Sequence, residues 1–192
     1  MSGAPGRVIF LNGTSSAGKT SLARAIQDES GTPFVYWGVD TLFGLVPPNW
    51  GGGRDGPLSH DGFRYDRTGR DADGQPTVVI RYGEVGRRML RSARAAAVAF
   101  AHGGDDLVID ELLLTPDLMP EWLAALSGLD VLLVGVTCPL EVAERRERVR
   151  AHPIGLARGH FHAVHDHGTA YDLTVDTTTA TPAELARAVL AR

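Results

Sequence analysis

The chain has 192 residues, a formal net charge of −4 and an isoelectric point near 5.9. This length fits one globular domain, and the acidic balance gives no general attraction to nucleic-acid phosphates, so we expect no nucleic-acid partner. One cysteine excludes an internal disulfide framework, and no apolar run resembles a membrane span or a secretory signal. We therefore expect a cytoplasmic protein with one domain, residues 1–192, that acts on a small molecule.

Strand and helix patterns alternate along most of the chain. Short apolar runs predict buried strands at residues 7–11, 34–37, 107–110, 131–136 and 173–176. Apolar residues at helical spacing predict helices at residues 21–27, 78–102, 117–126 and 140–150, and Thr181-Pro182-Ala183-Glu184 predicts the start of a last helix. Strands that alternate with helices form parallel sheets. The predicted fold is α/β, with a central five-stranded parallel sheet flanked by helices.

Residues 47–76 interrupt this alternation. Gly, Pro, Asp and Arg dominate the segment, and apolar residues are sparse. A loop of this length in a compact domain is usually functional or disordered. Because the α/β pattern resumes afterwards, we interpret the segment as a substrate-side flap or insertion rather than a linker.

The first predicted strand leads into Gly13-x-x-x-x-Gly18-Lys19-Thr20, and a predicted helix follows. In this context the pattern indicates a phosphate-binding loop, whose backbone N–H groups surround phosphate oxygens at the positive end of the helix. Lys19 would reach the β- and γ-phosphates, and the Thr20 hydroxyl would bind Mg²⁺. The alternative is an accidental glycine-rich turn. The candidate nucleotide-binding residues are Gly13, Thr14, Ser15, Ser16, Ala17, Gly18, Lys19, Thr20 and Ser21.

Lys19 is the only lysine of the chain. A compact ammonium group fits between phosphates where a planar guanidinium does not, so its retention among arginines supports a phosphate-binding role. A GTPase that reads guanine with an Asn-Lys-x-Asp motif needs a second lysine. The sequence therefore predicts ATP and Mg²⁺ as cofactors.

Two acidic sites follow predicted strands. Asp110 ends the run Val108-Ile109-Asp110, and we interpret it as the carboxylate on the metal side, with Glu111 as the weaker candidate. A helix cap or a solvated strand end is the alternative for Asp110. Asp40 ends the second predicted strand, where a carboxylate could accept the proton of an attacking hydroxyl. From spacing alone, Asp40 could equally cap a helix that begins at Thr41.

The helix at residues 140–150 ends in an arginine-rich run, and we expect a lid over residues 145–160. Guanidinium groups there would neutralise charge on the transferred phosphoryl group, and Arg146 and Arg150 are the catalytic candidates, with Arg158 as a further one. A solvated, salt-bridged helix is the alternative. His160, His162, His165 and His167 match no metal-binding spacing, so we interpret them as solvated or capping residues.

Several segments together resemble the chloramphenicol phosphotransferase family over nearly the whole chain. They are residues 11–20, Trp37-Gly38-Val39-Asp40, Val108-Ile109-Asp110, residues 130–138 and residues 171–177. The resemblance implies a P-loop kinase fold similar to adenylate and shikimate kinases, and transfer of the ATP γ-phosphate to an antibiotic hydroxyl, which would confer resistance. It also places the family's proposed base on Asp40 and favours an arginine lid.

The chain departs from that family on the substrate side. His152-Pro153 stands where the family carries an Asp-Arg pair, and residues 47–76 are longer and richer in glycine. The acceptor could therefore be chloramphenicol or another hydroxylated antibiotic, such as a nucleoside or peptide type. We expect its pocket to be built from Trp37, Asp40, Phe43 and the flap.

Two other functions stay open at this stage. One is a nucleoside or metabolite kinase with the same phosphate chemistry. The other is a P-loop ATP-binding regulatory module that signals through a protein partner. The apolar helix faces leave a homo-oligomer open as well.

Overall fold

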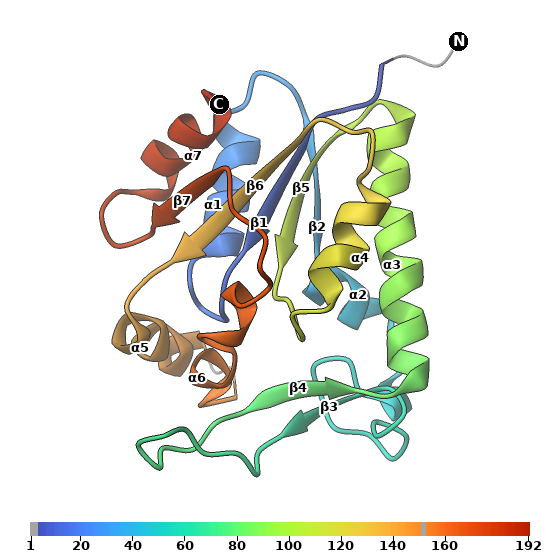
Figure 1. The fold of residues 1–192 in the computed structure, drawn as a ribbon, viewed down its shortest axis with the longest axis vertical. Coiled ribbons are helices and arrows are strands. Elements are labelled where there is room, and N and C mark those ends of the chain that lie inside the picture. The colour runs from blue at the N-terminus through green and yellow to red at the C-terminus, as the bar shows by residue number, and fades with distance from the viewer. Residues whose placement is uncertain (1–3, 151–152) are drawn as a thin grey trace.

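The computed structural model describes residues 4–150 and 153–192 (Figure 1). The strands are β1 (Val8–Asn12), β2 (Phe34–Gly38), β3 (Phe63–Asp66), β4 (Val79–Tyr82), β5 (Asp106–Glu111), β6 (Val131–Thr137) and β7 (Leu173–Asp176). The helices are α1 (Lys19–Glu29), α2 (Val39–Leu45), α3 (Glu84–Gly103), α4 (Leu118–Ala125), α5 (Leu140–Arg150), α6 (Leu156–His160) and α7 (Pro182–Leu190). Short 3₁₀ turns lie at Pro48–Trp50 and Ala163–His165. No helix in the described ranges is both long and apolar enough to cross a bilayer.

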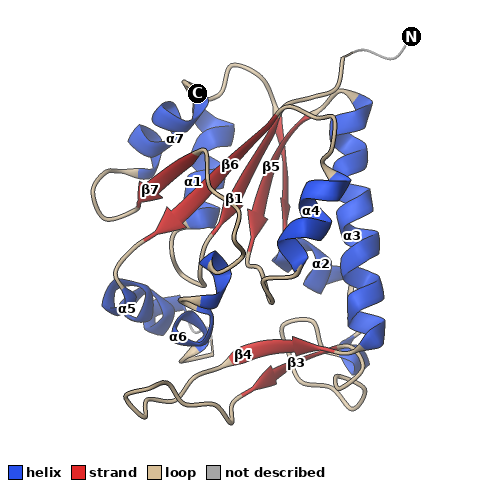
Figure 2. Cartoon of the chain, viewed as in Figure 1, coloured by secondary structure: helices blue, strands red, loops and turns tan. Residues whose placement is uncertain are grey.

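Five parallel strands form the central sheet in the order β2-β5-β1-β6-β7. The predicted fold class and all five predicted sheet strands are thus confirmed. The carboxyl ends of these strands point toward one edge of the sheet, where α5, α6 and the antiparallel β3–β4 hairpin lie (Figure 2). In open parallel sheets this edge is where ligands bind. The central strand β1 ends in the middle of that edge, and the phosphate loop begins there.

The central sheet is covered on both faces, and β1 shows why. Its side chains alternate between the faces, as they do in any strand. Ile9 and Leu11 belong to the core beneath α1 and α7, whereas Val8 and Phe10 belong to the core beneath α3 and α4. The Phe10 ring packs edge-on against Trp122 of α4, with ring centroids 5.3 Å apart. Burial of both faces explains why β1 reads as a continuous apolar run.

The helix predicted over residues 78–102 is wrong at its start. Residues 79–82 form β4, and the helix begins only at Glu84, after Gly83 in an extended conformation. The β-branched run Val78-Val79-Ile80 favours a strand, and it pairs with β3, a strand that the polar pattern of residues 47–76 does not indicate. Helix α3 therefore begins later than predicted, because the residues before it pair with β3.

Residues 47–83, which we call the hairpin lobe, lie across the carboxyl edge of the central sheet (Figure 1). Tyr65 pairs with Ile80, and Arg64 pairs with Arg81 in the hairpin register. Because paired residues share a face of the ribbon, Tyr65 and Ile80 lie on one face, and the two arginines lie on the other. The first of these faces lines the cavity described next.

Candidate active site

The phosphate loop runs from β1 into α1 through two residues in the left-handed backbone conformation, one of which is a glycine. Ser16 and Gly18 have positive φ angles of 60° and 104°. A Cβ atom at Gly13 would lie 2.2 Å from the Val136 carbonyl oxygen, so only glycine fits there. Lys19 is buried, and its Nζ donates to the Thr14 carbonyl at 3.0 Å. The lysine side chain therefore folds back onto the backbone of the phosphate loop.

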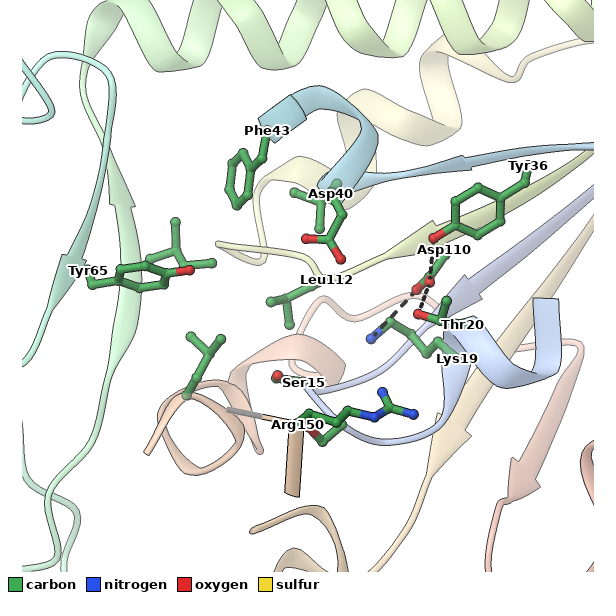
Figure 3. A pocket seen from close by; sticks show the side chains of 14 residues that line it. Ser15, Lys19, Thr20, Tyr36, Asp40, Phe43, Tyr65, Asp110, Leu112 and Arg150 are labelled. Carbon is green, nitrogen blue, oxygen red and sulfur yellow. Dashed lines mark hydrogen bonds and ion pairs between the residues drawn. The ribbon is translucent and has the colours of Figure 1, made fainter. Parts of the chain in front are cut away.

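Three polar side chains meet beside this lysine (Figure 3). Thr20 Oγ1 donates to Asp110 Oδ2 at 2.5 Å, and Tyr36 donates its hydroxyl to the same oxygen at 3.0 Å. Lys19 Nζ lies 3.8 Å from Asp110 Oδ1. Burial, together with the neighbouring Asp110 carboxylate, raises the pKa of Tyr36, so its hydroxyl remains a donor at neutral pH. Asp110 is thus a buried carboxylate held toward the phosphate loop, and the interpretations as a helix cap or a solvated strand end are wrong.

This group of side chains fits a magnesium-bound nucleotide. A hydroxyl and a carboxylate are the hard oxygen ligands that Mg²⁺ prefers. The Ser16 hydroxyl is buried in the same loop and makes no hydrogen bond within the described part of the chain. Buried hydroxyl groups normally have partners, so an unpaired one in a phosphate loop suits a bound phosphate. Thr20 and Asp110 could hold the metal, and residues 13–20 could hold the phosphates.

Glu111, the other acidic candidate, points away from this group. It follows Asp110 on β5 and therefore faces the opposite side of the sheet, near Trp122 and Arg94. Burial, with a further contribution from the Asp110 charge, raises the pKa of Glu111 to about 8. The carboxyl group is thus mostly protonated at neutral pH, and it does not suit a metal.

Asp40 lies in the first turn of α2, not at the end of a strand. The strand ends at Gly38, which is the N-cap of α2, and Thr41 Oγ1 accepts the Gly38 N–H at 3.3 Å. Asp40 is therefore not the cap, and α2 begins two residues before the predicted Thr41. The Asp40 carboxylate points into a cavity opposite Lys19 (Figure 3).

This cavity, which we call the acceptor cavity, has a volume of about 80 Å³. Apart from the polar group around Lys19 and Asp40, its walls are largely apolar or aromatic: Val39, Phe43, Tyr65, Ile80, Leu112 and Leu156. Phe43 lines it as predicted, but Trp37 does not, because it lies on the opposite face of β2 from Tyr36 and borders a groove beside α3 instead. The alternation of the strand is a signal that could have selected Tyr36.

The two candidate catalytic arginines of α5 lie close to the phosphate loop. Arg146 donates to the carbonyl of Ala17 at 3.2 Å, and to the hydroxyl and carbonyl of Thr177 at 2.9 and 3.1 Å. Arg146 therefore links the phosphate loop to the segment that follows β7. Arg150 is exposed and borders both the acceptor cavity and a second cavity of about 140 Å³ on the far side of the loop. Ser21, another candidate, also borders that second cavity.

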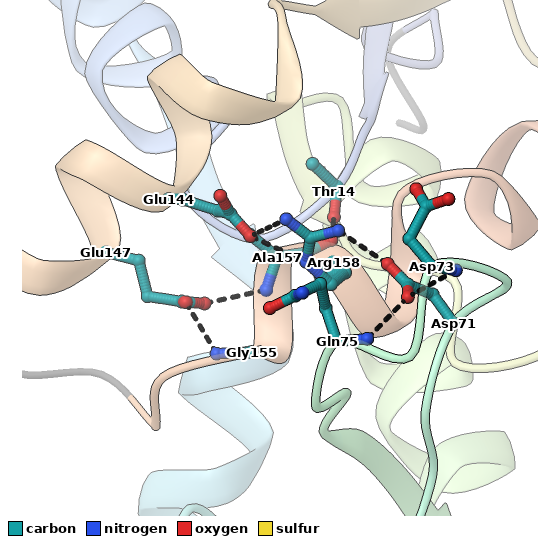
Figure 4. A network of polar contacts seen from close by, with 9 residues as sticks. All are labelled: Thr14, Asp71, Asp73, Gln75, Glu144, Glu147, Gly155, Ala157 and Arg158. Carbon is teal, nitrogen blue, oxygen red and sulfur yellow. Dashed lines mark hydrogen bonds and ion pairs between the residues drawn. The ribbon is translucent and has the colours of Figure 1, made fainter.

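Arg158 has a different position from the other two arginines. It forms ion pairs with Glu144 of α5 at 2.6 Å and with Asp71 of the hairpin lobe at 2.5 Å (Figure 4). Its guanidinium group thus joins two segments instead of facing the phosphates. This arrangement does not support a direct catalytic role for Arg158.

Glu147 anchors α6 from within this network. Its side chain is 1% exposed, and its two oxygens accept the N–H groups of Gly155 and Ala157 at 2.7 and 2.6 Å. The Ala157 carbonyl in turn accepts the Thr14 hydroxyl at 2.7 Å. The beginning of α6 is therefore fixed to α5 and to the phosphate loop together (Figure 4).

Glu147→Ala should lower the free energy of unfolding by about 2–4 kcal/mol, because it leaves two buried N–H donors without a partner, each at a cost of about 1–3 kcal/mol. Urea denaturation of the purified variant measures the change. Glu141→Ala, an exposed position on the same helix, is the matched control and should stay within about 0.5 kcal/mol of the unmodified chain. Equal stabilities for the two variants would show that Glu147 does not anchor α6.

Of the four histidines predicted to be solvated or capping, His162 is exposed, whereas His160, His165 and His167 are buried or half-buried. His160 is 1% exposed, and its Nε2 accepts the Ile80 N–H at 3.0 Å. Burial, followed by the charges of Arg81 and Lys19, lowers the pKa of His160 to about 4, so it remains a neutral acceptor. His160 therefore attaches the hairpin lobe to α6. His152, which differs from the resembled family, lies outside the described residues.

His165 and His167 both contact the Tyr171 hydroxyl, at 2.8 and 2.9 Å. The Thr169 N–H donates to His167 Nδ1, so the other ring nitrogen of His167 carries the proton and donates to Tyr171. Tyr171 also accepts from Asn12 at 2.7 Å and donates its own proton to His165. These histidines therefore help to hold the residue that precedes the phosphate loop.

The central strand of a five-stranded parallel sheet leads into a phosphate loop, and a helix follows the loop. This arrangement places the protein in the class of P-loop kinases. Solved structures with the same fold include a sugar kinase from Janibacter sp. HTCC2649, with a TM-score of 0.65 at 20% identity, covering 97% of this chain and 94% of that one. The APS kinase CysC of Mycobacterium tuberculosis has a TM-score of 0.62 at 18% identity and covers 98% of both chains.

The family can be stated more narrowly than the class. The profile of the family described as chloramphenicol phosphotransferase-like protein matches residues 6–192, so the chain belongs to this family. A Mycobacterium tuberculosis protein named "Putative O-phosphotransferase Rv2636" is 34% identical over 191 residues, covering 97% of this chain and 82% of the relative. The chain is therefore a kinase that transfers phosphate to oxygen, and the resemblance noted from the sequence is confirmed.

Proposed function

We propose that this kinase uses ATP and Mg²⁺ to phosphorylate a hydroxyl group of a small, largely apolar molecule of the antibiotic type. The observation that carries the proposal is the position of Asp40. Its carboxylate faces the phosphate loop across an apolar-walled cavity, where an alcohol could lie between the two. The likeness of the chain to the chloramphenicol phosphotransferase-like family supports an antibiotic alcohol as the acceptor.

The nucleotide would occupy the loop and the second cavity. ATP bound with Mg²⁺ supplies the phosphoryl group and a cation that offsets its charge. Residues 13–20 would hold the phosphates, with Thr20 and Asp110 on the metal. The second cavity, which includes Ser21, Leu22 and Pro182, would accommodate the base. Arg150 borders both cavities, so its guanidinium can stabilise charge between donor and acceptor.

Asp40 would act as the general base. It caps no helix, and its carboxylate accepts no hydrogen bond from the described residues, so its oxygens are available to a substrate. The acceptor hydroxyl would give its proton to Asp40 while its oxygen bonds to the γ-phosphorus atom, and the bond from that phosphorus to the β–γ bridging oxygen would break to release ADP. Lys19 and Arg150 would stabilise the negative charge of the transferred group.

The walls of the acceptor cavity favour a neutral, apolar alcohol around the reacting hydroxyl. The cationic residues that line this cavity are Lys19 and Arg150, and both lie on its phosphate side. Arg64 and Arg81 lie on the other face of the hairpin. A carboxylate or phosphate next to the reacting hydroxyl would therefore be desolvated without a partner, at a substantial cost.

A mass-spectrometric screen tests the proposed function. The purified chain is incubated with ATP and Mg²⁺ and with chloramphenicol, nucleoside antibiotics, peptide antibiotics and common nucleosides, each in parallel with an EDTA control. We expect the mass of one phosphoryl group to be added to at least one antibiotic, and to be absent with EDTA. Phosphorylation of nucleosides alone would indicate a nucleoside kinase instead. ATP hydrolysis without any phosphorylated acceptor would contradict the proposal and favour an ATP-binding regulatory module.

A further inference from the structure

An open cavity of about 450 Å³ lies beyond the acceptor cavity, between the hairpin lobe and the chain that leads into α6. We call it the outer cavity. The hairpin lobe lines it with Arg54, Tyr65, Arg67 and Val78, and the chain that leads into α6 lines it with Ile154. It is larger than the acceptor cavity, and no step of the proposed reaction uses it.

The two cavities are continuous along the hairpin lobe. Tyr65 lines both of them. Val78 lines the outer cavity, and Ile80, two residues further along the same extended segment, lines the acceptor cavity. Residues two apart in an extended chain share a face, so one surface runs from the reacting centre to the outer cavity. An acceptor longer than the inner cavity would follow this surface.

Two further segments border both cavities. Arg67, which lines the outer cavity, lies two residues beyond Tyr65, and the turn before α6 supplies Ile154 to the outer cavity and Leu156 to the acceptor cavity. The outer cavity is thus an extension of the acceptor cavity rather than a separate depression.

Charge distinguishes the outer cavity from the inner one. Arg67 Nη1 pairs with Asp55 at 2.9 Å, but both side chains are about half exposed, at 51% and 56%, and such pairs are weak. Among the described residues, Arg54 has no ion pair or hydrogen bond from its side chain. The outer cavity therefore has two guanidinium groups and, within the part of the chain that the structure describes, only one carboxylate paired with them, which leaves an excess of positive charge. Arginine binds carboxylates and phosphates well because its planar donors match their oxygens.

We infer that the outer cavity is a distal acceptor subsite that binds an anionic group of the acceptor, on the end remote from the reacting hydroxyl. This inference rests on the proposed function, because it assumes an acceptor whose hydroxyl lies beside Asp40. The acceptor class is then an elongated alcohol with an apolar or aromatic middle against Tyr65 and a carboxylate, sulfate or phosphate at Arg54 and Arg67.

Isothermal titration calorimetry with two matched alcohols tests the subsite. Both probes share the core 4-aminobenzyl alcohol, which is N-acetylated in the neutral probe and N-succinylated in the anionic one, so an aromatic ring separates the hydroxyl from the carboxylate. Binding is measured with Mg²⁺ and a non-hydrolysable ATP analogue, so the result does not depend on turnover. We expect the Kd of the anionic probe to be about ten-fold lower than that of the neutral probe, as two charge-assisted contacts allow.

The Arg54→Ala/Arg67→Ala variant should remove this preference, with the neutral probe as the internal reference. Arg64→Ala is the matched control, because Arg64 lies on the opposite face of β3 and should leave the preference intact. Equal Kd values for the two probes, no binding of the anionic probe, or a preference that survives in the double variant would each overturn the subsite. Phosphoryl transfer to the same probes is assayed separately. Charge-selective binding without transfer would contradict the proposed reaction and still support the subsite.

Discussion

Asp40→Asn is expected to lower kcat by a factor of about 100 to 10,000, the range that general-base catalysis usually contributes. Asparagine has nearly the same shape as aspartate, but its amide cannot take the proton of the acceptor hydroxyl. Asp40 is exposed in the first turn of α2 and is not its cap, so the change should disturb neither the helix nor the phosphate loop. The measurement is steady-state phosphorylation of the acceptor that the screen identifies.

The KM for ATP separates a missing base from a damaged site. It should stay close to that of the unmodified chain, because Asp40 lies on the acceptor side of the cavity. Asp28→Asn, an exposed position on α1, serves as the matched control and should keep full activity. A kcat for Asp40→Asn within a factor of about three of the control would be far below the usual contribution of a general base and would remove Asp40 from that role.

Lys19→Met should reduce phosphoryl transfer by at least about 1,000-fold, because removing one preorganised charge from a transition state costs about 100- to 1,000-fold and this side chain should also bind the nucleotide. Methionine has nearly the same length and no charge, so the buried stem remains filled. Transfer and nucleotide binding are measured together, by mass spectrometry and by titration with a fluorescent ATP analogue.

Lys19→Arg distinguishes geometry from charge. The ammonium group lies in a loop that closes on the Thr14 carbonyl, and a planar guanidinium does not fit the same space. The arginine variant should therefore be almost as inactive as the methionine variant, whereas Arg145→Met, at an exposed position on α5, should remain active. Substantial activity in Lys19→Arg would show that charge alone is sufficient in this loop.

The phosphate loop could be predicted because the residues that form it are contiguous in the sequence. The strand, the glycine pattern, Lys19 and the following helix lie within a short stretch, and the spacing itself carries the mechanism. Asp110 could be predicted from its place at the end of an apolar run. The five strands of the central sheet were recognisable for the same reason, since each is a short buried run with turn residues after it.

The acceptor cavity could not be derived in this way, because its walls come from separate segments. Tyr65 and Ile80 become neighbours only through the pairing of β3 with β4, and the residues around Ile80 also fit the periodicity of the helix that follows. Leu156 belongs to α6, whose five residues include a glycine and carry too little periodicity to be recognised. The positions of these side chains depend on contacts between segments that are distant in the sequence.

The arginines show a second limit of sequence reasoning. Composition identified a basic run near the phosphates, but it could not separate Arg146, which holds the loop backbone, from Arg158, which joins Glu144 to Asp71. The difference depends on which carboxylates and carbonyls surround each guanidinium. Those neighbours are distant in sequence, so local charge patterns do not reveal them.

The single lysine also has a practical consequence. Lysine labelled with ¹³C or ¹⁵N during expression would introduce one side-chain ammonium signal into the NMR spectrum, and that signal would come from the buried Lys19 in the phosphate loop. Nucleotide, metal and acceptor titrations could then be followed at the proposed reaction centre without any mutation or attached dye.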